Sequence, residues 1–187
     1  MGAFWSDARL EPKRKYRFQL QIGSDPAYVV TKVKNPAAKI TETPHKFLNH
    51  TFYYPGRVEW DPIDISFVDP GGLDDQSKNL YDKLYSSGYF APDALNEGMF
   101  GITKYAATTV GVGNVRINQL GHRGLQSKTS GLLESIGYWE LTNAFFTNIT
   151  WGDYDYNGEE MLECSVTIRY DYADFFKPGD SGFVPTV

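Results

Sequence analysis

The sequence predicts a mainly β fold, a sandwich or barrel of about seven strands with one flanking α-helix. Three observations support this class. Apolar and polar residues alternate with a period of two over several stretches, Gly, Pro, Asn and Asp separate those stretches, and only one segment has convincing helical periodicity. A length of 187 residues matches one domain, and no linker divides it. We therefore expect a single domain over 1–187, with a basic N-terminal extension (1–14) and a C-terminal tail (175–187).

The first part of the chain contains four predicted strands. Apolar residues alternate in Tyr16–Ile22, and a second apolar run, Tyr28–Val33, follows across a Gly-Ser-Asp-Pro turn. Lys46–Tyr54 and Arg57–Val68 have the composition of further strands. The alternation slips by one position at Pro62. Since proline cannot donate a ladder hydrogen bond, we expect a bulge or an edge position there.

One helix is predicted next. Asp74 and Asp75 stand at its start, and Gly88 follows where a C-terminal glycine cap belongs. Its apolar stripe consists of Leu80, Tyr81, Leu84 and Tyr85. In the Gly-, Thr- and Ser-rich stretch that follows, only Val112–Leu120 is predicted as a strand. The loop Gly121–Ser135 is long for a compact domain, so we expect it to be functional or to order when something binds it.

The C-terminal third has the clearest pattern. Tyr138–Trp151 reads as a strand with a kink near Ala144, and Leu162–Tyr172 alternates without interruption. Asn157-Gly158 lies between these two runs. This dipeptide favours a tight hairpin turn in which both residues have positive φ.

Charge is segregated along the chain. The formal net charge is −5, but residues 1–50 carry a net +5, 51–98 a net −6, 99–133 a net +4 and 134–187 a net −8. The acidic total argues against a protein that grips nucleic acid, because such proteins neutralise phosphates with Lys and Arg. Each block alone is compatible with an ordinary solvated face. Four blocks of alternating sign favour head-to-tail self-association.

Targeting and redox features are few. The longest unbroken apolar run has four residues, Ala27 to Val30, whereas a membrane helix needs ~18 or more. Early charged residues leave no room for a secretory signal. The single cysteine, Cys164, argues against a disulfide framework. We expect no membrane anchor and a protein that works where it is made or leaves with a particle.

No motif predicts a catalytic or metal site. Gly179–Gly182 resembles the segment around a serine-protease nucleophile, but Ser181 lies in a Gly/Pro-containing tail and no motif supplies the base. Asp153, Asp155, Asn157 and Gly158 match the first half of an EF-hand loop, yet the position that needs a bidentate Glu is Cys164. We therefore expect no enzyme activity, no cofactor and no metal.

The order of the predicted elements carries a family resemblance. Its parts are the strand Trp60–Phe67, the Asp-started helix, Val115–Leu120, Trp139–Trp151 with its Ala-Phe and Trp-Gly pairs, and the closing strand Glu163–Asp171. In this order they resemble the tail tube proteins of contractile-tailed bacteriophages, and also the tube protein of type VI secretion systems. The N-terminal extension and the 121–135 loop depart from the family pattern, and either could belong to a tube-end or baseplate variant.

The resemblance implies a structural virion protein whose hexameric rings stack head-to-tail into the inner tail tube, a conduit for DNA ejection. It implies contacts with the tail sheath, the baseplate hub and the tail terminator, and genomic DNA that passes the lumen without specific binding. The location would be the phage tail, assembled in the bacterial cytoplasm. The alternatives are a tube subunit of a tailocin, type VI or extracellular contractile injection system, and, more distantly, a small-ligand-binding β-barrel.

Two sets of polar residues are candidates for the lumen, and charged clusters are candidates for contacts between subunits. Acidic and neutral groups would let a polyanion slide, because they offer phosphate no cation. The lumen candidates are Glu59, Asp61, Asp64 and Ser66. The alternative polar face, which could instead meet the sheath or a neighbour, is Glu163, Ser165 and Thr167. The inter-subunit or inter-ring candidates are Lys13, Arg14, Lys15, Arg17, Asp153, Asp155, Glu159 and Glu160.

Overall fold

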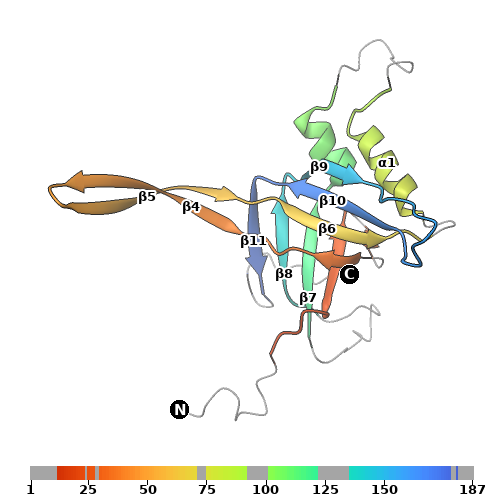
Figure 1. The fold of residues 1–187 in the computed structure, drawn as a ribbon, viewed down its shortest axis with the longest axis horizontal. Coiled ribbons are helices and arrows are strands. Elements are labelled where there is room, and N and C mark those ends of the chain that lie inside the picture. Colours follow the sequence, from red (N-terminus) through yellow and green to blue (C-terminus); the bar gives the residue numbers. More distant parts are fainter. Residues whose placement is uncertain are drawn as a thin grey trace.

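Two antiparallel sheets form the body of the protein (Figure 1). The structure is a computed structural model that describes residues 12–23, 25–27, 30–70, 75–91, 101–121, 135–177 and 180. The five-stranded sheet contains, in spatial order, β11 (Tyr172–Phe176), β8 (Ser135–Thr142), β7 (Val115–Leu120), β1 (Phe18–Ile22) and β2 (Asp25–Ala27). The four-stranded sheet contains β3 (Val30–Val33), β6 (Ile63–Val68), β10 (Glu163–Arg169) and β9 (Phe145–Thr150). The predicted mainly β class is confirmed.

The core consists of the inward-facing residues of both sheets. In β6 the apolar positions of the alternating pattern, Ile63, Ile65 and Phe67, are buried, and their partners in β10 are Ile168, Val166 and Cys164. The five-stranded sheet contributes Leu20, Ile22, Val115, Ile117 and Leu141 to the same cluster. Period-two alternation therefore predicted which side chains face the core, because successive side chains of a strand point to opposite faces.

Two predicted strands are wrong as single strands, because the chain changes sheets within them. The predicted strand Tyr28–Val33 is not one of these: it contains β3, and the chain changes sheets before it, since β2 pairs with β1 in the other sheet. Tyr138–Trp151 divides into β8 and β9 at Asn143, which has a φ of 55°. Leu162–Tyr172 divides at 170–171 into β10 and β11. The kink predicted near Ala144 lies at the division between β8 and β9. In Leu162–Tyr172 the alternation continues through the change of sheet, so periodicity alone did not reveal that division.

Two helical segments pack against each other beside the four-stranded sheet (Figure 1). The predicted helix is α1 (Gln76–Ser86); the Asp75 side chain accepts a hydrogen bond from the Lys78 amide at 2.9 Å, and Gly88 has the positive φ, 99°, of a C-terminal cap. Asp74 lies outside the described residues. The second segment, the π-helix η3 (Ala106–Val112), lies before the strand predicted at Val112–Leu120, which begins at Val115.

A long hairpin leaves the body of the protein and extends to the left in Figure 1. It consists of β4 (Ala38–Phe47) and β5 (His50–Trp60), and it prolongs the antiparallel pair β3 and β6. The predicted strand Lys46–Tyr54 is wrong, because it spans the turn at Leu48 and Asn49. The predicted strand Arg57–Val68 is interrupted at Asp61-Pro62, where the slip of alternation predicted a bulge or an edge position within one strand.

A bulge in the hairpin explains how a strand tolerates Pro55 and Gly56. The register shifts between Ile40 and Glu42, and the hydroxyl of Thr41 between them accepts from the Arg57 amide at 2.9 Å. A Cβ atom at Gly56 would lie 2.4 Å from that hydroxyl oxygen, so only glycine fits there.

The connection between β9 and β10 is longer than predicted. The two strands form an antiparallel pair, as expected, but the connection covers residues 151–162, and neither Asn157 nor Gly158 has a positive φ. The predicted two-residue turn is therefore wrong. Ser181, most of the 1–14 extension, most of the 175–187 tail and nearly all of the 121–135 loop lie outside the described residues.

Candidate functional site

The hairpin exposes apolar side chains along its whole length. Leu48 at the tip is 90% exposed. Its φ of 53° lies in the left-handed region, which is strained for a bulky side chain. A two-stranded hairpin is marginally stable in water by itself, and contiguous exposed apolar surface is typical of an interface. The exposed large apolar residues of the hairpin are Ile40, Phe47, Leu48, Phe52, Tyr53, Tyr54 and Val58.

The outer surface of the four-stranded sheet forms one polar face. Asp64 pairs with Thr167, whose hydroxyl donates to the Asp64 carboxylate at 2.9 Å, and Ser66 pairs with Ser165. Two of the four lumen candidates, Asp64 and Ser66, therefore belong to the same face as the whole alternative set. We name it the open polar face; its residues are Asp64, Ser66, Asn148, Thr150, Glu163, Ser165 and Thr167.

The charges on this face are balanced. Lys32 of β3 is paired with Ser66, and Arg169 continues the outward parity of β10; both are exposed. These two cations lie on the same side of the sheet as Asp64 and Glu163. The open polar face is therefore rich in hydroxyl groups and close to neutral, rather than acidic.

Glu59 and Asp61, the other two lumen candidates, are not part of the open polar face. Glu59 is exposed on β5 opposite Lys39, and Asp61 lies in the link between β5 and β6, where its amide donates to the Ala37 carbonyl at 2.9 Å. The four lumen candidates are therefore divided between the sheet and the root of the hairpin.

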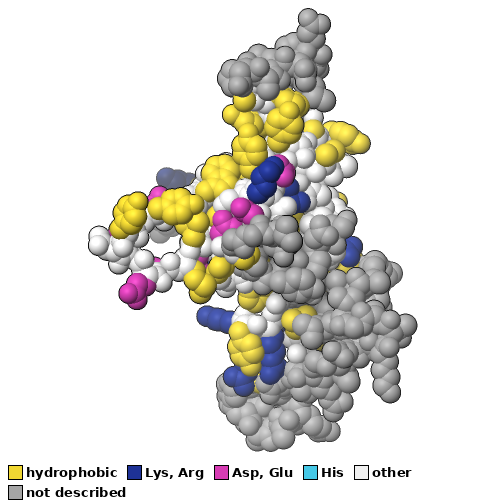
Figure 2. Space-filling view, turned by 90° about the vertical axis from the view of Figure 1, so that its right-hand side faces the viewer, with side chains coloured by type: hydrophobic (Ala, Val, Ile, Leu, Met, Phe, Trp, Pro, Cys, Tyr) yellow, Lys and Arg dark blue, Asp and Glu magenta, His cyan; other side chains and the backbone are white. Residues whose placement is uncertain are grey.

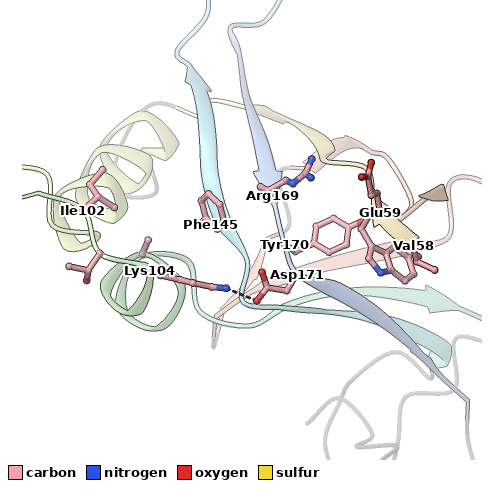
Figure 3. A pocket seen from close by; sticks show the side chains of 11 residues that line it. Val58, Glu59, Ile102, Lys104, Phe145, Arg169, Tyr170 and Asp171 are labelled. Carbon is pink, nitrogen blue, oxygen red and sulfur yellow. Dashed lines mark hydrogen bonds and ion pairs between the residues drawn. The ribbon is translucent and has the colours of Figure 1, made fainter. Parts of the chain in front are cut away.

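A cavity of about 660 Å³ lies at the root of the hairpin (Figure 3). Its walls combine side chains of β5, the η3 region and the end of β10. Lys104 forms an ion pair with Asp171 at 2.7 Å, and the Asn143 amide donates to the same carboxylate oxygen at 2.7 Å. These two donors, Lys104 first, lower the pKa of Asp171. The apolar part of the lining includes Val58, Trp60, Ile102, Phe145 and Tyr170.

Tyr170 at this cavity is 3% exposed, and its ring centroid lies 6.0 Å from that of Trp60. Burial raises the pKa of its phenol. A phenol with a raised pKa remains protonated near neutral pH, so it is a poor base and a poor nucleophile. Among the described lining residues, no hydrogen bond joins a nucleophile to a base in the way that covalent catalysis needs.

A second polar cluster, Asp69, Ser77 and Cys164, fixes α1 to the sheet. The Asp69 carboxylate accepts from the Ser77 hydroxyl at 2.5 Å and from the Gln76 amide at 2.9 Å. The Ser77 hydroxyl, followed by the two backbone amides, lowers the pKa of Asp69, although burial opposes this. Cys164 is 0% exposed, and burial raises the pKa of its thiol. An inaccessible thiol of raised pKa is unreactive, so the cluster is structural.

A basic cleft of about 560 Å³ lies where the segment before β1 meets β3 and β7. All four basic residues that the sequence predicted for inter-subunit contacts line it, together with a fifth cation from β3. Lys13 donates to the Gln119 carboxamide oxygen at 2.5 Å, and its ammonium lies 5.4 Å from the Phe175 ring centroid. The five cations of the basic cleft are Lys13, Arg14, Lys15, Arg17 and Lys32.

The predicted acidic residues share one exposed segment, the connection 151–162 between β9 and β10, which we name the acidic loop. Its carboxylates are Asp153, Asp155, Glu159 and Glu160, and all four are exposed. Tyr154 is 90% exposed beside them. Figure 2 shows a group of basic side chains at the lower end of the molecule; the acidic side chains lie above it, where further basic side chains are also present.

The structure brings the charged candidates into two compact clusters but does not bring those clusters together. Sequence reasoning missed the apolar hairpin. Its signal was the run Phe52-Tyr53-Tyr54, in which large apolar residues occupy both parities, so that one face must remain exposed in a single subunit. Among the described residues there is no group of three His, Cys, Asp or Glu that could hold a metal, and no helix there is long and apolar enough to cross a membrane.

No family model and no curated protein matches the sequence. Solved structures do match the fold. A chain of the anti-feeding prophage cap, the tube-terminating cap, has a TM-score of 0.61 at 15% identity, covering 89% of this chain and 92% of that one. A chain of the anti-feeding prophage baseplate has a TM-score of 0.60 at 13% identity, covering 90% and 98%.

A chain of the PVC sheath/tube terminator, from an extracellular contractile injection system in its extended state, gives a TM-score of 0.60 at 15% identity, covering 89% of this chain and 97% of that one. In all three cases the likeness covers nearly the whole of both chains. The protein is therefore structurally similar to chains of contractile injection particles and has their mainly β, tube-like fold.

Proposed function

We propose that this protein is a structural subunit of the inner tube, or of the end of the tube, of a contractile injection system. Copies join side by side into rings, hexameric as the family resemblance implies, and the rings stack head-to-tail. The observation that carries the proposal is the hairpin β4–β5, which projects its apolar side chains away from the body of its own subunit.

Removing apolar side chains from water provides the free energy for association. Fully burying a large apolar side chain stabilises a complex by about 1.5–3 kcal/mol, and the hairpin exposes seven such side chains. Association costs at least several kcal/mol in lost rotational and translational freedom. Burying the tip residues Phe47 and Leu48 together with one or two neighbours on an adjacent copy is therefore comparable with this cost, and the other exposed side chains of the hairpin add to the gain.

The likeness in fold supports one kind of particle over the other. A contractile phage tail tube was the main expectation, but the similar chains belong to anti-feeding prophage and PVC particles. We therefore favour an extracellular contractile injection system over a phage tail, with a tube-terminating or baseplate position as an alternative to the tube itself. The partners proposed on this basis are a sheath, a baseplate hub and a terminator, and the location is the assembled particle.

We further propose that the open polar face lines the lumen. Its hydroxyl groups and balanced charges hold neither a polyanion nor a polycation strongly, because two acids and two cations offset each other in number. Such a surface lets a cargo slide. This replaces the expectation of an acidic lumen that repels DNA, since Glu59 and Asp61 do not belong to the face.

Negative-stain electron microscopy of the purified protein tests the proposal. We expect hollow rods or rings of constant diameter, and we expect their loss in the double variant Phe47→Ser, Leu48→Ser. The matched control is Val110→Ser, an exposed apolar residue of η3 outside the hairpin. If the wild type stays a monomer at every concentration, the protein is not a tube subunit. The cavity of about 660 Å³ would then favour a small-ligand-binding β protein.

A further inference from the structure

We propose that the acidic loop of one copy docks into the basic cleft of a second copy. The inference rests on the proposed function, because it names the contact that sets the direction of self-association. It differs from the hairpin contact, which is apolar, since the two surfaces involved are charged and come from other parts of the fold.

The basic cleft is formed by three parts of the chain. The segment that precedes β1 provides four cations, β3 provides Lys32, and β7 provides the amide of Gln119 at the cleft wall. Lys13 is held in place by its hydrogen bond to Gln119. Uncharged donors, Thr31 and Asn35, also line the cleft. A concave surface with five cations and amide and hydroxyl groups fits a short acidic segment.

The acidic loop has the complementary charge. Four carboxylates occur within eight residues, and in the described part of the chain none of them forms an ion pair. The loop has a defined base, because Asp155 accepts from the Asn157 amide at 3.0 Å and Gly152 adopts a φ of 78° against the Glu163 carbonyl. It therefore presents its charges outward instead of using them within its own subunit.

The occupant of the cleft is a second copy for two reasons. The ion pairs within the described residues join Lys78 to Asp82, Lys104 to Asp171 and Arg116 to Glu140, and none joins the loop to the cleft. The two surfaces also lie at different places on the subunit. The acidic loop follows the end of β9, at the right of Figure 1, and the basic cleft lies at the start of β1. Two different complementary patches on one chain form a heterologous contact, which propagates into rings or filaments.

Nucleic acid is the competing occupant, because Lys and Arg also bind phosphate. The loop is the better candidate because the chain supplies its own acidic partner, four carboxylates for a cleft lined by five cations, and because the protein as a whole is acidic, with a net charge of −5. Two copies also repel each other through this net charge, but salt screens that repulsion beyond a Debye length, whereas the loop and the cleft attract each other at contact distance.

Charge reversal tests the contact. The loop variant is Glu159→Lys with Glu160→Lys, the cleft variant is Lys15→Glu with Lys32→Glu, and the combined variant carries all four changes. All four side chains are exposed, so folding should be unaffected, which thermal unfolding checks. As a control, Lys78→Glu with Asp82→Lys exchanges an exposed pair on α1 without changing the net charge.

Sedimentation velocity is the measurement, at salt concentrations from ~0.05 to ~0.5 M. We expect each single-surface variant to associate roughly tenfold or more weakly than the wild type at low salt, and the combined variant to recover the loss. Wild-type association should weaken as salt rises, and the control should match the wild type.

The outcomes separate this inference from the proposed function. If both single-surface variants associate like the wild type at every salt concentration, and the tip variant of the hairpin does not, the tube proposal stands and the loop-to-cleft contact is wrong. If the cleft variant retains self-association but loses binding to a double-stranded oligonucleotide, the cleft is a nucleic-acid site and the inference is overturned. A wild type that never associates contradicts both proposals.

Discussion

Removing the Asp69 carboxylate should destabilise the subunit by releasing the start of α1. In Asp69→Ala the Gln76 amide at 2.9 Å and the Ser77 hydroxyl at 2.5 Å both lose their acceptor. Loss of a helix-capping acceptor costs ~0.5–2 kcal/mol, and a polar group left without its partner adds to this. We therefore expect a loss of about 2 kcal/mol in the free energy of unfolding. For a domain of this size that corresponds to a decrease in Tm of roughly 4–8 °C.

The pH dependence gives a second readout. The pKa of Asp69 is lowered from its ordinary value of 3.8, chiefly by the Ser77 hydroxyl. The folded state therefore binds this proton less readily than the unfolded state, so the carboxylate contributes stability above pH 3.8 and loses it as the pH falls through the lowered pKa. The difference between wild type and Asp69→Ala should be constant near neutral pH and should decrease in acid.

Urea unfolding of dilute protein, followed by tryptophan fluorescence and far-UV circular dichroism, measures both effects, since dilution removes the contribution of association. The matched control is Asp82→Ala on the same helix, which removes an exposed pair with Lys78 and should cost less than ~0.5 kcal/mol. The reasoning is refuted if Asp69→Ala and Asp82→Ala unfold at the same urea concentration, or if the effect of Asp69→Ala increases in acid.

Two further predictions concern packing around the helices. Cys164 is 0% exposed and the pKa of its thiol is raised, so a thiol reagent should modify native protein roughly a hundredfold or more slowly than urea-unfolded protein; equal rates would show that the site opens freely. In Gly111→Ala the new Cβ would lie 1.9 Å from the Ser87 hydroxyl oxygen, so α1 and η3 must separate. We expect a loss of ~1–3 kcal/mol by chemical denaturation, partly recovered by Ser87→Gly, and an unchanged midpoint would contradict the close packing of these helices.

Sequence periodicity predicted the faces of the strands better than their ends. Cys164, Val166 and Ile168 are buried at the positions that alternation assigned to the core, and Asp75 caps α1 where the sequence placed the start of the helix. The division between β10 and β11 could not be predicted. Both strands keep the same alternation, and the sheet to which each belongs is decided by partners far away in the chain, β6 for one and β8 for the other.

The sequence predicted which charged residues cluster when they are neighbours in the chain, whereas the fold decided which distant residues join them. The four basic candidates before β1 and the four acidic candidates of the acidic loop form compact clusters, as their closeness in sequence required. Lys32 joins the basic cleft only because β3 lies near the start of β1. The lumen candidates were divided for a similar reason, since the break at Asp61-Pro62 separates the β5 residue Glu59 from the face that carries Asp64.

The changes of sheet along the chain have a consequence for how the subunit is made. The five-stranded sheet pairs β1 with β7 and β8 with β11, so its last strand, β11, ends only at Phe176. During synthesis the hairpin β4–β5 can form early, because its contacts are local, whereas the body must wait for nearly the whole chain. A nascent subunit thus has an apolar hairpin and unpaired strand edges before it has a core. We expect folding to be slow and largely post-translational, and premature contact between hairpins of unfinished chains to be the main route to aggregation.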